Sequence, residues 1–314
     1  MKRTLIVYDT KYGSTKLISQ NLARVLGPSN FITPLEFCDC FYDFDFVVIG
    51  SPVYNEQILP SIRNFVLTNL DWLKSKKIAL FAVGMHPSSE KYLLDIQNLL
   101  GDCVIWTGKF GGILNPSALD ENDNQTMRRF SAYTGYPIAY TDCRNERTFA
   151  AESVALRRIL YNTCSMPKDK LKKQLEDFLL SHNTCVLCTG HDGDVRATPI
   201  EYLYHNESFY FFSEGGEKAA HLLINSNVSI AVNDSYKGFQ KLAGLQVTGK
   251  AEIVTFGSIE YMDAATAKGL NYENIKKLPV MMNLIKVKPV QYEFLYSELS
   301  KEGYAVKQAI KLPN

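Results

Sequence analysis

The stretch Tyr8-Asp9-Thr10-Lys11-Tyr12-Gly13-Ser14-Thr15 decides the fold of the N-terminal half of this chain. It follows the apolar run Thr4-Leu5-Ile6-Val7-Tyr8, which predicts a buried strand, and it opens a helical stretch over about Ser14 to Leu26. A loop that passes from a strand into a helix directs backbone N–H groups outward at the positive end of the helix dipole. The segment is therefore expected to bind an anion.

The side chains of this loop favour a phosphate monoester as that anion. Thr10, Ser14 and Thr15 offer hydroxyl donors, and Gly13 allows the backbone to turn closely around a ligand. The loop lacks the G-x-x-x-x-G-K-[ST] arrangement that holds a nucleoside triphosphate with magnesium. An alternative remains open, because serine and threonine are also ordinary helix caps.

Strand and helix patterns alternate through the first half of the chain. Apolar runs at Phe46–Gly50, Ile78–Val83 and Cys103–Trp106 predict strands, the first of them buried on both faces. Helical stretches start at Pro60 and span Ser88 to Leu100. This alternation predicts an open, doubly wound parallel sheet with helices on both faces.

Three further loops follow the predicted strands, and ligands of open α/β sheets bind at the carboxyl ends of the strands. We expect these loops to hold a flat ring beside the anchored phosphate, with Tyr54 stacked on it, unless Tyr54 is only a packing aromatic. The expected binding residues are Thr10, Lys11, Tyr12, Gly13, Ser14, Thr15, Ser51, Pro52, Val53, Tyr54, Asn55, Gly84, Met85, Phe110, Gly111 and Gly112.

The pattern changes near Pro167. Lys168 to Leu180 predicts an amphipathic helix, and short strands separated by Gly, Asn and Asp turns follow it. These strands predict a small antiparallel barrel. The boundary is expected between residues 162 and 168, which gives domains 1–165 and 166–314.

The composition is that of a globular protein. With 314 residues and a formal net charge of +1, the chain has room for two domains and no overall field that attracts nucleic acid or anionic lipid. No apolar run has the length of a membrane span. The seven cysteines form no framework, so a cytoplasmic location with reduced thiols is expected. Cys185 and Cys188 lie in a predicted strand, where residues three apart face opposite ways, and no metal site is expected.

The loop Thr10-Lys11-Tyr12-Gly13-Ser14-Thr15 resembles the phosphate loop of flavodoxins. The Gly50-Ser51-Pro52-Val53-Tyr54 loop, Phe110-Gly111-Gly112 and Thr141-Asp142-Cys143-Arg144-Asn145 resemble the subgroup that contains menaquinone-dependent protoporphyrinogen oxidase. The resemblance covers about residues 1–162. It implies a flavodoxin-like fold with non-covalent FMN, whose phosphate contacts Thr10–Thr15 and whose ring lies against the Tyr54 loop. It does not carry over the porphyrin substrate.

Residues 168–297 resemble the pyridoxamine 5′-phosphate oxidase-like split barrels. The resemblance rests on Asp192–Pro199, Phe211–Lys218, Leu222–Val228 and Gly244–Ala251. It implies a second FMN and a homodimer formed through the barrel, although some members bind heme, other flavins or no flavin. The residues implied are Arg196, Ala197, Thr198, Ser213, Glu214, Lys218 and Gln246, of which Arg196, Ser213 and Lys218 would hold the phosphate and Gln246 would approach the flavin from an adjacent strand.

These expectations favour an FMN-dependent oxidoreductase or electron-transfer protein. The flavodoxin domain would relay electrons to or from a barrel that acts on an unknown small substrate. The chain would exchange electrons with a redox partner protein or with that substrate. One alternative is a non-catalytic electron carrier whose barrel serves dimerisation or ligand binding, and a further alternative is a protoporphyrinogen oxidase. The sequence identifies neither catalytic side chains nor the direction of electron flow, because flavin itself supplies the chemistry.

Overall fold

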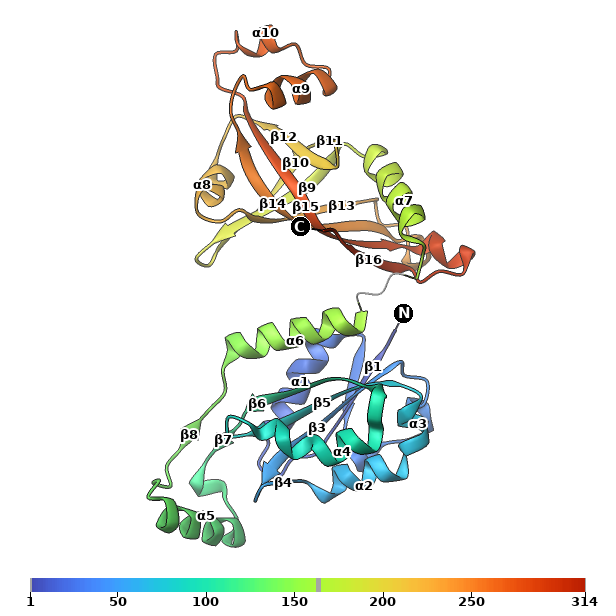
Figure 1. Cartoon of the computed structure of the whole chain (residues 1–314). Helices are drawn as coiled ribbons and strands as arrows, with labels where there is room; N and C mark the ends of the chain where they lie inside the picture. The colour runs from blue at the N-terminus through green and yellow to red at the C-terminus, as the bar shows by residue number, and fades with distance from the viewer. Residues whose placement is uncertain (1, 162–164, 314) are drawn as a thin grey trace. The chain divides into compact units, whose positions relative to one another are not determined.

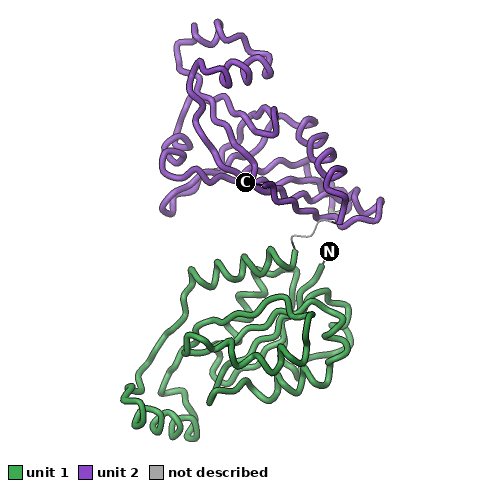
Figure 2. Tube along the Cα trace, in the orientation of Figure 1, with its two compact units in different colours: residues 1–161 green, residues 162–314 purple. Residues whose placement is uncertain are grey.

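The computed structural model describes residues 2–161 and 165–313. The chain divides into two compact units, residues 1–161 and 162–314 (Figure 2). The expected domain boundary at 162–168 begins in residues 162–164, which lie outside the described residues.

The first unit is an open α/β sheet with helices on both faces (Figure 1). Its strands are β1 (Thr4–Tyr8), β2 (Ser29–Ile32), β3 (Phe46–Tyr54), β4 (Gln57–Ile58), β5 (Lys77–Gly84), β6 (Val104–Gly111), β7 (Ile113–Leu114) and β8 (Thr141–Asp142). Its α-helices are α1 (Ser14–Leu26), α2 (Pro60–Thr68), α3 (Leu70–Lys74), α4 (Leu94–Leu100), α5 (Glu121–Thr134) and α6 (Glu146–Tyr161).

The main sheet has the strand order β2-β1-β3-β5-β6, and all of these neighbours are parallel. This is the flavodoxin-like order, so the expected fold is confirmed. All five residues of β1 are buried, because the sheet is covered on both sides. One face packs on α2, α3 and α4, and the other packs on α1 and α6.

Several expected element bounds were wrong. The strand expected to end at Trp106 continues as β6 to Gly111, so Lys109, Phe110 and Gly111 lie in the strand and not beyond it. The helix expected from Pro60 is two helices, α2 and α3, and the one expected from Ser88 is a 3₁₀ turn followed by α4.

The second unit is a curled antiparallel half-barrel sheet. Its strands are β9 (Thr184–His191), β10 (Asp194–Glu201), β11 (Leu203–His205), β12 (Ser208–Ser213), β13 (Asn227–Asn233), β14 (Ala243–Val254), β15 (Asn283–Tyr296) and β16 (Lys307–Lys311). Its α-helices are α7 (Lys168–Leu180), α8 (Glu217–Ile224), α9 (Ile259–Ala267) and α10 (Tyr272–Ile275).

The strands of this unit follow the order β10-β9-β13-β14-β15-β12-β11, and β16 pairs with β15. The apolar side of α7 carries Leu171, Leu175 and Leu179, which are buried in the main core of the unit. Helix α7 has the bounds expected from the sequence, and the expected antiparallel class of the domain is confirmed.

A substitution of Gly50, in β3, tests how tightly the hydrophobic core of the first unit is packed. A Cβ added there would lie 2.0 Å from the ring of Phe81, which is fully buried. We expect Gly50→Ala to lower the free energy of unfolding of the first unit by about 1–3 kcal/mol, because the core has no room for the methyl group. Urea unfolding followed by circular dichroism measures this.

Gly27→Ala is the matched control within the first unit, since an added Cβ there meets its nearest atom at 3.7 Å, an ordinary contact. If both substitutions changed the stability equally little, the packing described around Phe81 would be incorrect.

Candidate functional site

A cavity of about 600 Å³ lies at the carboxyl ends of β1, β3, β5 and β6. This volume is in the range of small-molecule and cofactor sites, and the position is the one where open α/β sheets bind ligands. Its lining combines apolar side chains with a few polar ones, as such sites do. Of the residues expected from the sequence, it brings together Tyr12, Gly13, Ser14, Pro52, Val53, Tyr54, Asn55, Gly84, Met85 and Gly112.

Helix α1 begins at this cavity without a capping side chain. Gly13 precedes it at φ 88°, in the left-handed region that favours glycine, and the Gly13 N–H donates to Thr10 Oγ1 at 2.9 Å. The first N–H groups of a helix have no partner within the helix, and among residues 2–161 and 165–313 those of Ser14, Thr15 and Lys16 have no other backbone partner.

Thr15 adds a hydroxyl to this helix start. The residue is fully buried, and Thr15 Oγ1 has no hydrogen-bond partner within residues 2–161 and 165–313. Ser14 Oγ accepts from the Ile113 N–H at 3.1 Å and keeps its own hydrogen to donate. Buried polar groups normally have partners, and the Thr15 hydroxyl, in the first turn of α1, is an exception.

Lys11 and Tyr12 attach the loop to the start of α5. Lys11 Nζ lies 2.6 Å from a carboxylate oxygen of both Asp120 and Asp123, and the Tyr12 hydroxyl donates to Asp123 at 2.5 Å. The hydrogen bonds to Asp120 and then Asp123 hold the pKa of Lys11 above its ordinary value. The Lys11 ammonium group is thus paired with these carboxylates, and its expected contact with a phosphate stays a prediction.

Tyr54 lies against the same loop. Its ring meets the Tyr12 ring edge-on, with 5.8 Å between centroids. Burial raises the pKa of Tyr54 to about 12, and hydrogen bonding from the backbone of Tyr12 and Lys11 partly offsets this rise. Because Tyr54 is at the cavity wall beside the helix start, a bound ring can contact it, although stacking on it stays a prediction.

Some expected residues do not line the main cavity, namely Thr10, Lys11, Thr15, Ser51, Phe110 and Gly111. Ser51 is buried and accepts from the Leu59 N–H, and Phe110 packs in the core against Phe81. An added Cβ on Gly111 would lie 1.9 Å from the Cys143 carbonyl oxygen, so this glycine makes room for the returning chain. Phe110 and Gly111 instead line a smaller cavity of about 280 Å³ beside α1 and α6.

The sequence interpretation missed the residues that cover the cavity. The segment between β6 and α6 leaves the sheet, forms α5 and returns by the β7–β8 pair (Figure 1). The length of this excursion was the available signal, since long connections in compact domains usually serve function. Its residues at the cavity are Ile113, Leu114, Asn115, Ala118, Leu119, Asp123, Thr126, Met127 and Tyr140.

In the second unit, several expected residues gather at the start of α8. Gly216 precedes this helix at φ 104° without a capping side chain, which is the arrangement seen at α1. Arg196 forms an ion pair with Glu217, and Lys218 Nζ donates to the Gly215 carbonyl. Ser213 is buried with its hydroxyl accepting from the Gly215 N–H at 3.2 Å.

The remaining residues do not form one group with these. Thr198 Oγ1 is buried without a partner in the described part of the chain, and Glu214 is exposed. The strand register places Ala197 and Gln246 on one face of the sheet, while Arg196 and Thr198 point to the other. Strand β14, which carries Gln246, is separated from β10 by β9 and β13 and from β12 by β15, and the expected approach of Gln246 to a flavin stays a prediction.

The Cys185–Cys188 pair lies in strand β9, as expected. Cys185 is buried, and that burial raises the pKa of its thiol to about 12, whereas Cys188 is half-buried on the opposite face. Such a thiol stays protonated and unreactive at neutral pH.

Residues 5–139 match the flavodoxin domain family, and residues 171–296 match the pyridoxamine 5′-phosphate oxidase family. The chain thus carries a flavodoxin domain followed by a split-barrel domain of the second family. Together they indicate a redox role. Neither match identifies the protoporphyrinogen oxidase subgroup.

No curated protein matches the chain. Among solved structures, the heme storage protein HutZ from Vibrio cholerae is 18% identical over 38% of this chain and 89% of its own, with a TM-score of 0.34. The FAD-binding protein of Mycobacterium smegmatis is 19% identical over 44% and 96%, with a TM-score of 0.32. An FAD-binding protein of Mesorhizobium loti is 19% identical over 38% and 89%, with a TM-score of 0.32.

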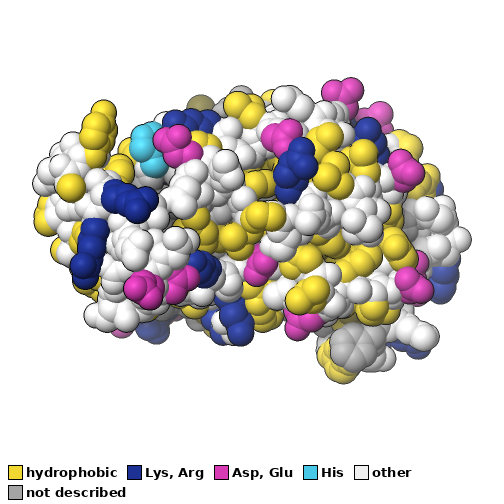
Figure 3. All heavy atoms as spheres, turned by 90° about the horizontal axis from the view of Figure 1, so that it is seen from below, with side chains coloured by type: hydrophobic (Ala, Val, Ile, Leu, Met, Phe, Trp, Pro, Cys, Tyr) yellow, Lys and Arg dark blue, Asp and Glu magenta, His cyan; other side chains and the backbone are white. Residues whose placement is uncertain are grey.

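Within the described residues, no helix has the length and apolar character needed to cross a membrane. On the face shown in Figure 3, basic and acidic side chains are interspersed among hydrophobic ones, in agreement with the formal net charge of +1.

Proposed function

We propose that this protein is an FMN-dependent oxidoreductase that transfers electrons between a small substrate and a redox partner protein. The observations that carry the proposal are the cavity at the carboxyl ends of the first sheet, which Gly13 and Ser14 line at the uncapped start of α1, and the buried Thr15 hydroxyl in the first turn of that helix. A phosphate dianion fits free N–H groups at a helix start, and a flat ring fits the mostly apolar cavity beside it.

The residues of the first unit would each have a physical role. The loop of residues 10–15 would bind the phosphate through its N–H groups and the hydroxyls of Ser14 and Thr15. Tyr54 and Met85 would contact the ring, and the α5 segment would exclude water from it. A bound flavin supplies the redox chemistry, since flavins exchange hydrides and electrons while the protein orients them.

A second flavin is proposed for the barrel, at the start of α8. Two observations support it: an uncapped helix start after a glycine at positive φ, and the cations Arg196 and Lys218 beside it. These cations would form charge-assisted hydrogen bonds with a phosphate. Glu217 now pairs with Arg196, so binding would require Arg196 to exchange this carboxylate for the phosphate.

The barrel is further proposed to form a homodimer through the sheet face that carries Ala197 and Gln246. On this face Val186, Cys188 and Ala231 are only half-buried in the single chain. Gln246 of one copy would then approach the flavin held by the other. Joining two redox sites on one chain raises the effective concentration of each near the other.

The proposal predicts two FMN per polypeptide, measured as flavin released on denaturation of protein saturated with FMN.

Thr15→Val should weaken FMN binding to the first unit by about tenfold to a hundredfold, since a hydrogen bond to a charged phosphate is lost. Lys218→Ala should lower occupancy of the barrel alone.

Ser19→Ala is the matched control for Thr15→Val. Ser19 is also fully buried in α1, and its hydroxyl likewise has no partner among the residues described, but it lies beyond the helix start. A single FMN per chain that survives Lys218→Ala would exclude the barrel site, and equal FMN binding by the Thr15 and Ser19 variants would exclude the phosphate role of Thr15.

Enzyme and carrier are distinguished by turnover with a reduced nicotinamide. The proposal expects the FMN-loaded protein to oxidise NADH or NADPH continuously in the presence of an electron acceptor, with two electrons and a proton leaving each nicotinamide as a hydride. Absorbance at 340 nm measures this rate. If neither NADH nor NADPH were oxidised while two FMN were bound per chain, the protein would be interpreted as an electron carrier, and not as an enzyme, for these donors.

A further inference from the structure

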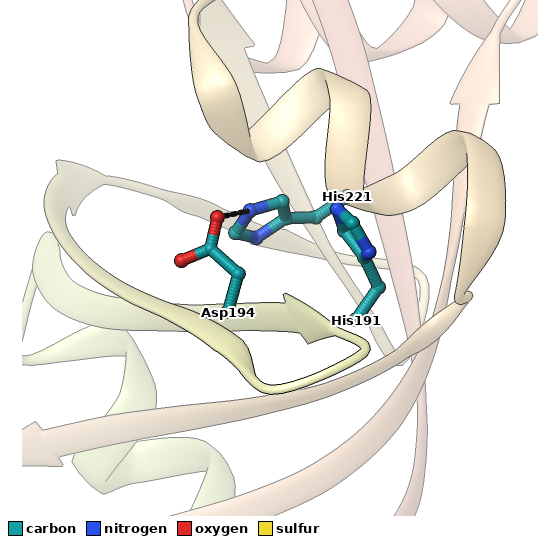
Figure 4. Close-up of side chains that lie close together, drawn as sticks. All are labelled: His191, Asp194 and His221. Carbon is teal, nitrogen blue, oxygen red and sulfur yellow. Dashed lines mark hydrogen bonds and ion pairs between the residues drawn. The ribbon is translucent and has the colours of Figure 1, made fainter.

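Three potential metal ligands meet between the β9–β10 hairpin and α8, outside the groups assigned to flavin (Figure 4). They are His191 at the end of β9, Asp194 at the start of β10 and His221 in α8. One ligand atom from each lies within 4.8 Å of the other two. Two imidazoles and one carboxylate form a ligand set typical of divalent transition metals.

The hairpin fixes two of the ligands. His191 and Asp194 are directly paired across the strands, and the turn between them places Asp192 and Gly193 at φ 43° and 93°. Positive φ at both central residues is the tight two-residue turn that suits a hairpin. The two side chains therefore project from neighbouring positions with little freedom to separate.

His221 is held from the opposite side. It is 2% exposed, and its Nδ1 lies 3.0 Å from Thr189 Oγ1 while its Nε2 lies 3.3 Å from Asp194 Oδ2. The second nitrogen of a metal-binding imidazole usually has a hydrogen-bond partner, most often a carboxylate, a backbone carbonyl or water, and here the Thr189 hydroxyl takes that place. Because a threonine hydroxyl can donate or accept, Thr189 can serve either tautomer of His221.

The distances fit an ion after a small adjustment. Ligand atoms about 2.0–2.2 Å from a tetrahedral ion are about 3.4 Å from one another. The His221–Asp194 distance of 3.3 Å already agrees with this value. The ligand atom of His191 lies within 4.8 Å of the other two, so its ring needs to move by no more than about 1.4 Å to reach this separation, within the reach of a side-chain rotation.

His191 supplies an independent indication. Its Nδ1 is buried and has no hydrogen-bond partner in the described chain, and the nearest carboxylate oxygen, from Asp192, is 3.5 Å away. A buried polar atom without a hydrogen-bond partner destabilises the fold, and coordination of a metal ion by the His191 ring would offset this cost. Asp194, by contrast, is 70% exposed in its side chain, so an ion can enter from solvent and keep a water ligand.

We propose that His191, Asp194 and His221 bind one divalent transition-metal ion of the zinc class, which ties α8 to the β9–β10 hairpin. Three protein ligands leave a fourth position open to water. Since α8 begins with Glu217 and Lys218, the ion would also order that helix start. The inference does not depend on the proposed function.

The test is a titration of the chelator-treated full chain with Zn²⁺ alone, followed by calorimetry. We expect a saturable site for one Zn²⁺ per chain and a rise in melting temperature at saturating Zn²⁺, because the ion binds the folded state. His191→Ala and Asp194→Asn should each remove this site or weaken it at least tenfold. Both changed residues are partly exposed, and melting in chelator confirms that each variant folds.

His205→Asn is the matched control. His205 Nε2 lies 3.0 Å from Asp263, so this variant removes a His–Asp contact of the same kind elsewhere in the barrel and should leave Zn²⁺ binding unchanged. Zinc held by the exposed Cys38 and Cys40 would persist in all three variants. The proposal is overturned if the chain shows no saturable Zn²⁺ site, or if His191→Ala and Asp194→Asn bind Zn²⁺ as the unchanged chain does.

Discussion

The N–H groups at the start of α1, which no side chain caps, are the constraint around which the first unit is organised. They exist because β1 is buried on both faces, so the chain must leave the sheet at its carboxyl end and enter a covering helix directly. Gly13 makes the turn possible with its positive φ, and no side chain caps the helix. The neighbouring strands deliver their loops to the same edge, which places an apolar cavity beside a site for an anion.

The α5 segment depends on the same loop. Tyr12 and Lys11 contact Asp120 and Asp123, so the cover of the cavity is fastened to the anion site by charge and hydrogen bonds. The carboxylates also bring negative charge close to the loop, and Lys11 compensates it. In the barrel, the start of α8 repeats the combination of a glycine at positive φ and an uncapped helix, with Arg196 and Lys218 as cations.

The elements that could be predicted correctly are those whose hydrophobic pattern is visible within a short stretch of sequence. Helices α1 and α7 have the expected bounds, because each shows a clean apolar face and a clear start. Strand β15 was not anticipated. It contains Pro289, which the interior of a sheet rarely holds, and the register shift beside Gly249 is where the proline is accommodated. The edge strand β2 is short and buries little, so its pattern is weak.

The candidate sites likewise combine residues that a local pattern predicts with residues that only tertiary packing brings together. The loops of the first cavity could be inferred, because parallel strands bring their carboxyl ends together. The lining from α5 and the meeting of His221 with the β9–β10 hairpin could not, because tertiary packing alone brings them there. The sheet face that carries Gln246 could not be predicted either, since the face on which a strand residue lies depends on a register that composition does not show.

Binding of FMN compared with riboflavin tests the central claim most directly, because the two ligands differ only in the phosphate. Flavin fluorescence titration of the full chain carrying Lys218→Ala, in which the barrel site is weakened, measures the dissociation constants of FMN and of riboflavin. If the free N–H groups of α1 hold the phosphate, FMN should bind about a hundredfold or more tightly than riboflavin, and the difference should shrink in Thr15→Val. Equal affinities for FMN and riboflavin would contradict the account.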